Sequence, residues 1–318
     1  MSLTVFLELV EIKTKIASFF PFIIGILFSI SYFHSFHLAL TLLFFVAMLI
    51  FDMTVTAINN YQDYQKAKSE SYKQEQNVIG REKISPIMVR NLIVFMLMVS
   101  LILGILLTFL TGYMLLLLGA ICFFIGIFYT YGPIPLSRMP LGEIFSGFTM
   151  GFGIFAMIVY VNTSGTGAFY LDLNLANDSF ALAGSLTGVA AIFLASLPLV
   201  FTIANIMLAN NLRDLDTDIE NHRYTLVYYI GRKTGLTLFH TLMYASYALL
   251  LVGLVARIYE WPVLFAFISF FPVRKNLQAH KLEMPAPHSF VYSLKNMVVF
   301  NSFYSLGLLL SILWQQLS

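Results

Sequence analysis

Long apolar runs separated by short polar segments make up almost the whole chain. Most of these runs approach the length of about 20 residues that a helix needs to cross the hydrocarbon core of a bilayer. The chain holds nine such runs, near residues 16–34, 37–59, 91–110, 113–131, 143–163, 186–209, 236–256, 260–273 and 297–315. The eighth run is short and is bounded by Pro262 and Pro272. The pattern predicts an all-α polytopic membrane protein in which about nine transmembrane helices form one bundle, with residues 1–318 as a single domain.

The composition excludes a soluble protein. The chain is 59% hydrophobic and 11% charged, with a mean hydropathy of +0.82, whereas in soluble domains about a quarter of the residues are charged. A lone cysteine, Cys122, lies inside an apolar run, so we expect neither a disulfide framework nor a thiolate metal site. Charged residues precede the first apolar run and no small-residue cleavage pattern follows it, so we expect no cleavable signal.

Basic residues predict how the chain is oriented. If the N-terminus is in the cytoplasm, the nine-span pattern places every lysine and arginine on the cytoplasmic side except Arg257, which falls outside. This bias is the one expected of membrane proteins. The nine-span pattern then places the C-terminus outside the cell. Residues 164–185 form an external connector that carries Asp172 and Asp178 without basic residues. The polar motifs described next lie on the cytoplasmic side, so we expect the bundle to hold a central cavity that opens there.

Two polar stretches end apolar runs in the same way. In the first, Asn59 and Asp63 are four residues apart, and in the second the same spacing separates Asn210, Asp214 and Asp218. Residues four apart share one face of a helix. Clustered oxygen ligands at a membrane surface suit Mg²⁺, which binds carboxylates together with substrate phosphates. The alternative is that both stretches are ordinary polar helix ends, which is less compelling because the pattern occurs twice.

Other polar residues lie close to these stretches. Asp52 lies inside the second apolar run, where a carboxylate is costly, so it either pairs with a basic residue or has a role in function. The charged segment 61–90 follows the first stretch and is a candidate cap over a polar site. Gly132-Pro133-Ile134-Pro135 predicts a stiff turn before Arg138. We find no pattern typical of nucleic-acid binding.

With these motifs placed, the chain resembles the UbiA superfamily of intramembrane aromatic prenyltransferases over nearly its full length. The first family motif corresponds to Asn59-Asn60-Tyr61-Gln62-Asp63, with Asn60 where the family usually has aspartate and Glu70 as the nearest substitute for a later acid. The DxxxD motif is intact as Asp214 and Asp218. His222 replaces the family's glycine after it. Within the family, the branch that acts on 1,4-dihydroxy-2-naphthoate is the most similar. The similarity to this branch rests on Asn210–Asp214, the YGPIPL and LGE stretches, Gly80 with Ile84-Ser85-Pro86, and Lys13-Thr14 with Pro21 and Gly25.

The resemblance implies that a polyprenyl group is transferred from its diphosphate to an aromatic ring, with loss of the ring carboxylate as CO₂. The expected location is a bacterial cell membrane, and the prenyl tail would enter from the lipid. Mg²⁺ would be held by Asn59, Asp63, Asp214 and Asp218. Further ligation or hydrogen bonds would come from Asn60 and Asn211. Phosphate oxygens would be bound by Arg81, Lys83, Arg138 and Arg223. The acceptor carboxylate would be bound by Lys13 or Arg138.

Two alternatives remain open. Within the same enzyme class, the acceptor could be another aromatic compound such as 4-hydroxybenzoate. From a different class, an ion-coupled transporter would use the intramembrane Asp52 and the polar stretches as an ion path. A transporter predicts polar residues throughout the depth of the bilayer, whereas here they gather at the cytoplasmic ends of the apolar runs.

Overall fold

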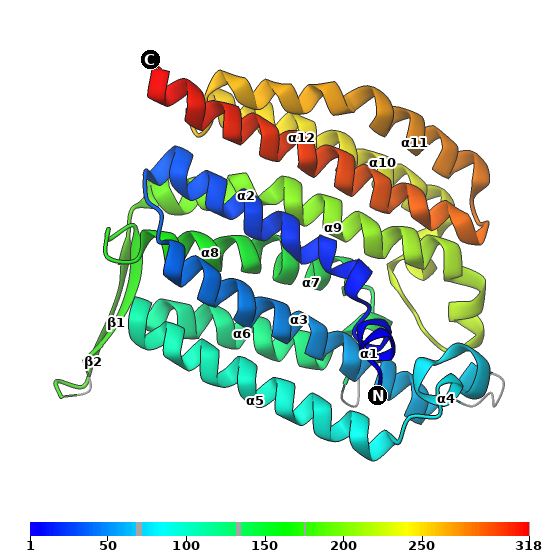
Figure 1. Ribbon diagram of the computed structural model, residues 1–318. Helices are drawn as coiled ribbons and strands as arrows, with labels where there is room; N and C mark the ends of the chain where they lie inside the picture. Colours follow the sequence, from blue (N-terminus) through cyan, green and yellow to red (C-terminus); the bar gives the residue numbers. More distant parts are fainter. Residues whose placement is uncertain (68–71, 132–134, 175, 318) are drawn as a thin grey trace.

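The computed structural model describes residues 1–318 except 68–71, 132–134, 175 and 318. Long helices lie side by side and form one bundle, with the N- and C-termini at opposite ends (Figure 1). In chain order the elements are α1 (Leu3–Leu9), η1 (Ile12–Lys15), α2 (Ile16–Phe33), α3 (Leu38–Lys66), η2 (Tyr72–Gln76), α4 (Val78–Arg81), α5 (Pro86–Thr111), α6 (Tyr113–Thr130), η3 (Leu136–Arg138), α7 (Gly142–Ser146), η4 (Gly147–Gly153), α8 (Ile154–Thr163), β1 (Phe169–Asn174), β2 (Ser179–Gly184), α9 (Leu186–Glu220), α10 (Leu226–Val255), η5 (Trp261–Ser269), α11 (Phe270–Glu283), η6 (Pro287–Ser289) and α12 (Phe290–Leu317).

The helices confirm a polytopic membrane protein. Within the described residues, seven helical segments are long and apolar enough to cross a membrane. They are Ile12–Phe33, Leu38–Lys66, Pro86–Thr111, Gly142–Thr163, Leu186–Glu220, Leu226–Val255 and Pro287–Leu317. The shorter apolar helix α6 and the η5–α11 segment lie alongside them in Figure 1. The count of nine crossings therefore stays a prediction.

Two helices continue well past the apolar runs that predict them. The second run ends near residue 59, but α3 continues to Lys66, and the sixth run ends near residue 209, but α9 continues to Glu220. Both extensions carry the polar motifs. The motifs therefore lie on helices that extend beyond the apolar span rather than in loops.

The apolar core is divided unequally between α9 and α3. The largest cluster of buried side chains joins α9 to α2, α8, α10, α11 and α12. Helix α3 contributes to two smaller clusters, one with α2, α5, α6 and α8 and one with α1, α4 and α5. The most apolar window of α9 is 61% buried inside the protein, against 28% for that of α3. Helix α9 is therefore a central element and α3 a peripheral one.

The connector expected over residues 164–185 contains secondary structure. Strands β1 and β2 pair antiparallel, with Leu171 opposite Leu182 and Leu173 opposite Phe180. Short alternating segments of this kind form a hairpin because successive side chains point to opposite faces. The hairpin lies at the end of the bundle opposite the polar motifs (Figure 1).

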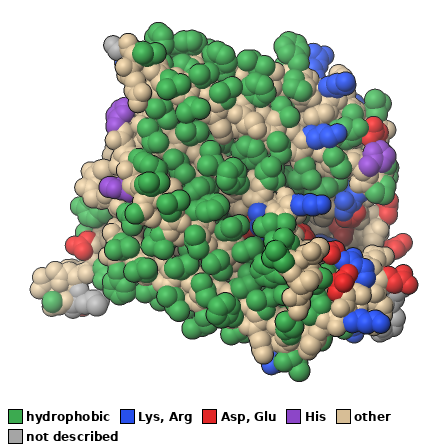
Figure 2. Space-filling model, in the orientation of Figure 1, with side chains coloured by type: hydrophobic (Ala, Val, Ile, Leu, Met, Phe, Trp, Pro, Cys, Tyr) green, Lys and Arg blue, Asp and Glu red, His purple; other side chains and the backbone are tan. Residues whose placement is uncertain are grey.

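Charged side chains gather at the other end of the molecule. Figure 2 shows lysines, arginines and acids around a hollow at this end, whereas green hydrophobic side chains cover most of the visible surface along the helices. We call it the charged end. Such a distribution is expected of a chain that crosses a bilayer, because exposed charge is costly in hydrocarbon.

Candidate active site

The second motif lies on the last turns of α9, and an arginine contacts each of its aspartates. Arg213 donates to both oxygens of Asp214 and to Oδ1 of Asn210. Arg223, just beyond the helix, places Nε 3.4 Å from Oδ1 of the buried Asp218. Both oxygens of Asp214 are thus engaged, whereas Oδ2 of Asp218 has no partner among the described residues.

The first motif lies on the last turns of α3 and packs against the N-terminal segment. The side-chain amide of Asn60 donates to the Leu9 carbonyl (2.9 Å) and to Oε1 of Glu11 (3.2 Å). Asn77 donates to the Asn60 carbonyl, which fixes the segment before α4 against α3. The part of the expected cap that the structure describes therefore folds onto the motif, although Glu70 lies outside the described residues. Asn60 is at least partly structural, because its amide nitrogen faces α1.

Two arginines connect the motifs. Arg138 and Arg223 each lie within electrostatic range of both Asp63 on α3 and Asp218 on α9. The structure therefore gathers carboxylates that are 155 positions apart in the sequence (218 − 63) around shared cations. A group of positive charges between acids suits a ligand that brings both negative charge and a metal ion.

The oxygen atoms at the charged end suit a hard metal cation. Among the buried oxygens that have no hydrogen-bond partner within the described residues, four belong to the motifs and to Glu143 and Asn211, namely Asn59 Oδ1, Glu143 Oε2, Asn211 Oδ1 and Asp218 Oδ2. Buried polar atoms are normally paired, so unpaired ones indicate a missing partner. In the part of the chain that the structure describes, no three His, Cys, Asp or Glu residues converge as a metal centre by themselves. Amide and carboxylate oxygens of this kind suit Mg²⁺, which takes a few protein oxygens and completes its shell with water and phosphate.

Glu143, the last residue of the LGE stretch, and Tyr129 join the site, although neither is among the predicted site residues. Asn211 donates to Oε1 of the buried Glu143 at 2.8 Å, which joins α7 to α9. The Tyr129 hydroxyl lies near both Glu143 and Arg223. The sequence signals that could have indicated them are positional: Glu143 follows a predicted turn, and Tyr129 lies at the end of an apolar run. Residues 132–134 of that turn lie outside the described residues.

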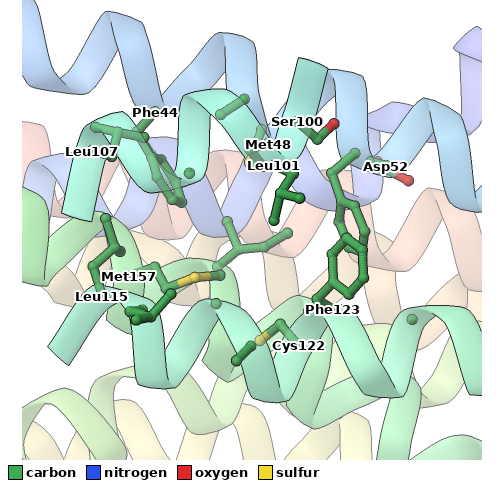
Figure 3. A pocket seen from close by; sticks show the side chains of 18 of the residues that line it. Phe44, Met48, Asp52, Ser100, Leu101, Leu107, Leu115, Cys122, Phe123 and Met157 are labelled. Atoms are coloured by element: carbon green, nitrogen blue, oxygen red, sulfur yellow. The ribbon is translucent and has the colours of Figure 1, made fainter. Parts of the chain in front are cut away.

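An apolar cavity of about 440 Å³ reaches Val55 on α3, four residues before Asn59 of the first motif. It lies between α3, α5, α6 and the η4–α8 segment. Figure 3 shows Asp52, Ser100 and Phe123 at one end of the cavity, and Phe44, Leu107 and Leu115 at the other. Asp52 is the charged residue among those that line it. The cavity is thus suited to a hydrocarbon chain.

Asp52, in the cavity wall, belongs to a buried ion pair. Lys15 donates to Oδ1 of Asp52 at 2.8 Å and to Oγ1 of Thr56, and Ser18 donates to Oδ2 of Asp52 at 2.6 Å. The Lys15 and Asp52 side chains are 8% and 16% exposed. Of the two possibilities that the sequence left open for Asp52, the structure shows pairing with a basic residue. The pair satisfies both buried charges.

The remaining candidates lie further from the motifs. Arg81 pairs with Glu8 and Glu82, and its hydrogen bond to Glu8 is the main reason that the pKa of the guanidinium is raised. Lys83 is exposed in the turn after α4, and Lys13 is exposed before α2, where Lys15 reaches inward instead. Arg138 and Arg223 are therefore the predicted basic residues that the structure brings to both motifs.

A membrane bundle with two Asn/Asp motifs at one end and an apolar cavity along one of the motif helices suits an intramembrane enzyme that acts on a lipid with a charged head group. The sequence profile of the UbiA prenyltransferase family matches residues 18–294, and the chain belongs to this family. It is 28% identical over 318 residues to the 1,4-dihydroxy-2-naphthoate octaprenyltransferase of Bacillus subtilis (strain 168), covering 96% of this chain and 92% of that protein. It is 26% identical over 205 residues to the enzyme of the same name from Mycobacterium leprae (strain TN), covering 64% of this chain and 61% of that protein.

Solved structures confirm the fold. A structure of digeranylgeranylglyceryl phosphate synthase has a TM-score of 0.65 at 17% identity and covers 98% of both chains. A UbiA homologue from Aeropyrum pernix K1 also has a TM-score of 0.65, at 16% identity, covering 90% of this chain and 96% of that one. A UbiA homologue from Archaeoglobus fulgidus bound to DMAPP and Mg²⁺ has a TM-score of 0.57 at 13% identity, covering 94% and 99%. At these identities the likeness shows the fold alone.

Proposed function

We propose that this protein transfers a polyprenyl group from polyprenyl diphosphate to 1,4-dihydroxy-2-naphthoate, with loss of CO₂ and diphosphate, to give a demethylmenaquinol. The names of the Bacillus subtilis and Mycobacterium leprae relatives support the acceptor. The Archaeoglobus fulgidus homologue with DMAPP and Mg²⁺ supports the donor and the cofactor.

The single observation that carries the proposal is the continuous face of α3. Asp52 and Val55 line the apolar cavity, and Asn59 and Asp63 follow Val55 at successive intervals of four residues. Residues at this spacing share one helix face. A ligand lying along this face meets hydrocarbon first and then amide and carboxylate oxygens. A prenyl diphosphate has this distribution of apolar tail and polar head.

The residues at the charged end support ionisation of the donor. Asn59, Asp63, Asp214 and Asp218 would hold Mg²⁺, which neutralises the charge that develops on the diphosphate as the carbon–oxygen bond breaks. Arg138 and Arg223 would bind the remaining phosphate oxygens, because both already lie near the carboxylates. The electron pair of the broken bond leaves with the diphosphate.

The end of the cavity where Asp52 lies suits an allylic cation. Phe51 and Phe123 stack with ring centroids 5.2 Å apart and both line the cavity. Aromatic faces stabilise cations, and apolar surroundings exclude the water that would trap the cation as an alcohol. The ring carbon that bears the carboxylate then attacks the cation and forms the new carbon–carbon bond. Loss of CO₂ returns an electron pair to the ring and restores aromaticity.

The proposal includes the orientation. The charged end faces the cytoplasm, the N-terminus is cytoplasmic and the C-terminus is external in a bacterial cell membrane, as the basic residues predict. The donor enters from the lipid and the acceptor from the cytoplasm. Arg138 is better placed than Lys13 to bind the acceptor carboxylate, because Arg138 lies within electrostatic range of both Asp63 and Asp218.

The test is an acceptor comparison with purified protein in lipid nanodiscs. Labelled prenyl diphosphate and Mg²⁺ are supplied with either 1,4-dihydroxy-2-naphthoate or 4-hydroxybenzoate. We expect prenylated product from the naphthoate and one CO₂ released per product. A product that keeps its carboxylate, or a preference for 4-hydroxybenzoate, would move the protein to another branch of the family. Prenyl transfer to neither acceptor would contradict the proposed activity.

A further inference from the structure

The β1–β2 hairpin has one apolar face and one polar face. The pairing puts Phe169, Leu171, Leu173, Phe180 and Leu182 on one side of the sheet. The other side carries Tyr170, Asp172, Asn174, Ser179, Ala181 and Ala183. Phe180 is 75% exposed and Leu182 is 63% exposed, so this apolar face is not covered by the described part of the chain. An exposed apolar face of this kind marks a contact with another phase or partner.

The base of the hairpin fixes the direction in which this face points. The Phe169 ring packs against Tyr160 with centroids 5.2 Å apart, and β1 packs against α6. Tyr160 in turn donates to the Thr111 carbonyl at the end of α5. Because Phe169 shares its face with Leu171 and Leu173, the apolar side is turned toward the helix ends. The polar side therefore faces away from the bundle.

The position of the hairpin places it at the level of a membrane surface. It runs across the ends of the helices and projects past α5 and α6 (Figure 1). The adjoining end of α5 exposes Phe109 (82%) and Leu110 (54%), and that of α6 exposes Tyr113 (40%). These side chains belong to apolar helices of the bundle. The apolar face of the hairpin therefore continues the lipid-facing surface of the bundle.

We propose that the hairpin lies in the lipid–water interface, with its apolar face among the acyl chains of the leaflet opposite the charged end and its polar face in water. A two-stranded hairpin is marginally stable alone in water, so a second surface is needed to hold it. Its open strand edges carry unpaired backbone groups, which cannot be placed in hydrocarbon. The interface satisfies both requirements, because the edges reach water and head groups while the apolar side chains reach lipid.

Neighbouring positions on β2 provide a matched test. Ser179, Phe180, Ala181 and Leu182 alternate between the two faces while sharing one strand. Each is replaced in turn by cysteine in a Cys122→Ala protein, labelled with a nitroxide and placed in phosphatidylcholine nanodiscs. Collision rates with oxygen, which concentrates in lipid, are compared with those of a water-soluble nickel chelate. We expect the oxygen-to-nickel ratio to be several-fold higher at positions 180 and 182 than at 179 and 181.

Two outcomes would overturn the proposal. Equal, water-like ratios at the four positions would show that the hairpin stands in solvent. Dipolar broadening at position 182 that disappears when labelled protein is diluted with unlabelled protein would show that a second copy covers the face. The measurement does not depend on catalysis, so its result is independent of the proposed activity.

Discussion

The two motifs of the site are supported by different kinds of packing. The α9 motif belongs to the most buried long helix, and close contacts hold that helix. A side chain at Gly151 of η4 would meet the backbone nitrogen of Val200 on α9 at 2.6 Å. The turns of α3 before its motif line a cavity, where a Cβ added to Gly104 of α5 or Gly119 of α6 would meet nothing within 4 Å. We call the two sides the α9 half and the α3 half. The α9 half is closely packed, whereas the α3 half contains unfilled volume.

This difference matches the two ends of the proposed donor. A diphosphate has the same size and charge in every prenyl donor, so a rigid α9 can hold it without adjustment. A hydrocarbon tail is long and flexible, so the α3 side needs volume rather than fixed contacts. If the two halves differ in this way, variants in each half should respond differently.

The largest effect is expected at the motif carboxylates, where variants in the two halves should lose the same amount of activity. Asp218→Ala on α9 and Asp63→Ala on α3 should each lower the rate of prenyl transfer by about 1,000-fold, because each removes electrostatic stabilisation of the leaving group. Initial rates of protein that elutes as one folded peak provide the measurement. Asp216→Ala is the matched control, since its side chain is 76% exposed and bound to Arg232. Full activity after EDTA treatment would contradict a shared metal site.

The next effect concerns the α3 half, which contains the Lys15–Asp52 ion pair. Lys15→Met leaves the Asp52 carboxylate buried without its partner and should reduce the free energy of unfolding by about 3–5 kcal/mol. Adding Asp52→Leu should recover most of the loss, because the unpaired charge is then removed. Thermal unfolding in detergent measures both. Lys13→Met, at an exposed position two residues away, should have little effect. An equal loss in the double variant would argue against this account.

The α9 half should instead respond to pH through His280 on α11. His280 is fully buried and stacks on Phe239 with centroids 4.3 Å apart. Burial, helped by nearby His240, lowers its pKa to about 4. The unfolded state, with a pKa of about 6.5, binds a proton that the folded state does not, so stability falls as the pH drops from about 6.5 to about 4. The total loss is about 3 kcal/mol.

The pH effect is measured by chemical unfolding across this range. His280→Leu should flatten the dependence, whereas His288→Gln should preserve it, because the His288 side chain is 66% exposed. An unchanged slope in His280→Leu would assign the effect to other groups.

The smallest effect compares glycines in the two halves. Gly151→Ala forces a methyl group against the α9 backbone and should destabilise the protein by about 1–3 kcal/mol. Gly104→Ala faces open space within a helix and should stabilise it by up to about 1 kcal/mol. Unfolding midpoints of the two variants give the answer. If both variants destabilise equally, the halves do not differ in packing as described.

The sequence predicts the helical membrane fold and the location of both motifs because hydropathy and four-residue spacing are local properties. At the hairpin it predicts only a connector, because the alternation covers six residues in each strand. Such a short pattern carries little weight beside long apolar runs. The full lengths of α3 and α9 also exceed the prediction, since polar residues end a hydropathy window without ending a helix.

The partners within the site depend on the fold and could not be predicted from spacing. Lys13 and Lys15 are equivalent as sequence signals, but the turn of η1 directs Lys15 toward Asp52 and leaves Lys13 exposed. The position of Asn60 in the motif suggests further ligation or hydrogen bonds to the substrate, and the fold adds hydrogen bonds from its amide nitrogen to Leu9 and Glu11. Glu143 and Asn211 lie 68 positions apart, and only the packing of α7 on α9 joins them.

The face of α3 that passes from the apolar cavity to the charged end has a kinetic consequence. If the donor reaches the site from the bilayer, its effective concentration is its mole fraction among the lipids rather than its amount per volume of sample. Adding empty vesicles that exchange lipid with the proteoliposomes should then slow the reaction at constant total donor. If the acceptor arrives from water through the charged end, it should show no such dilution. The enzyme would thus obey two-dimensional kinetics for one substrate and three-dimensional kinetics for the other.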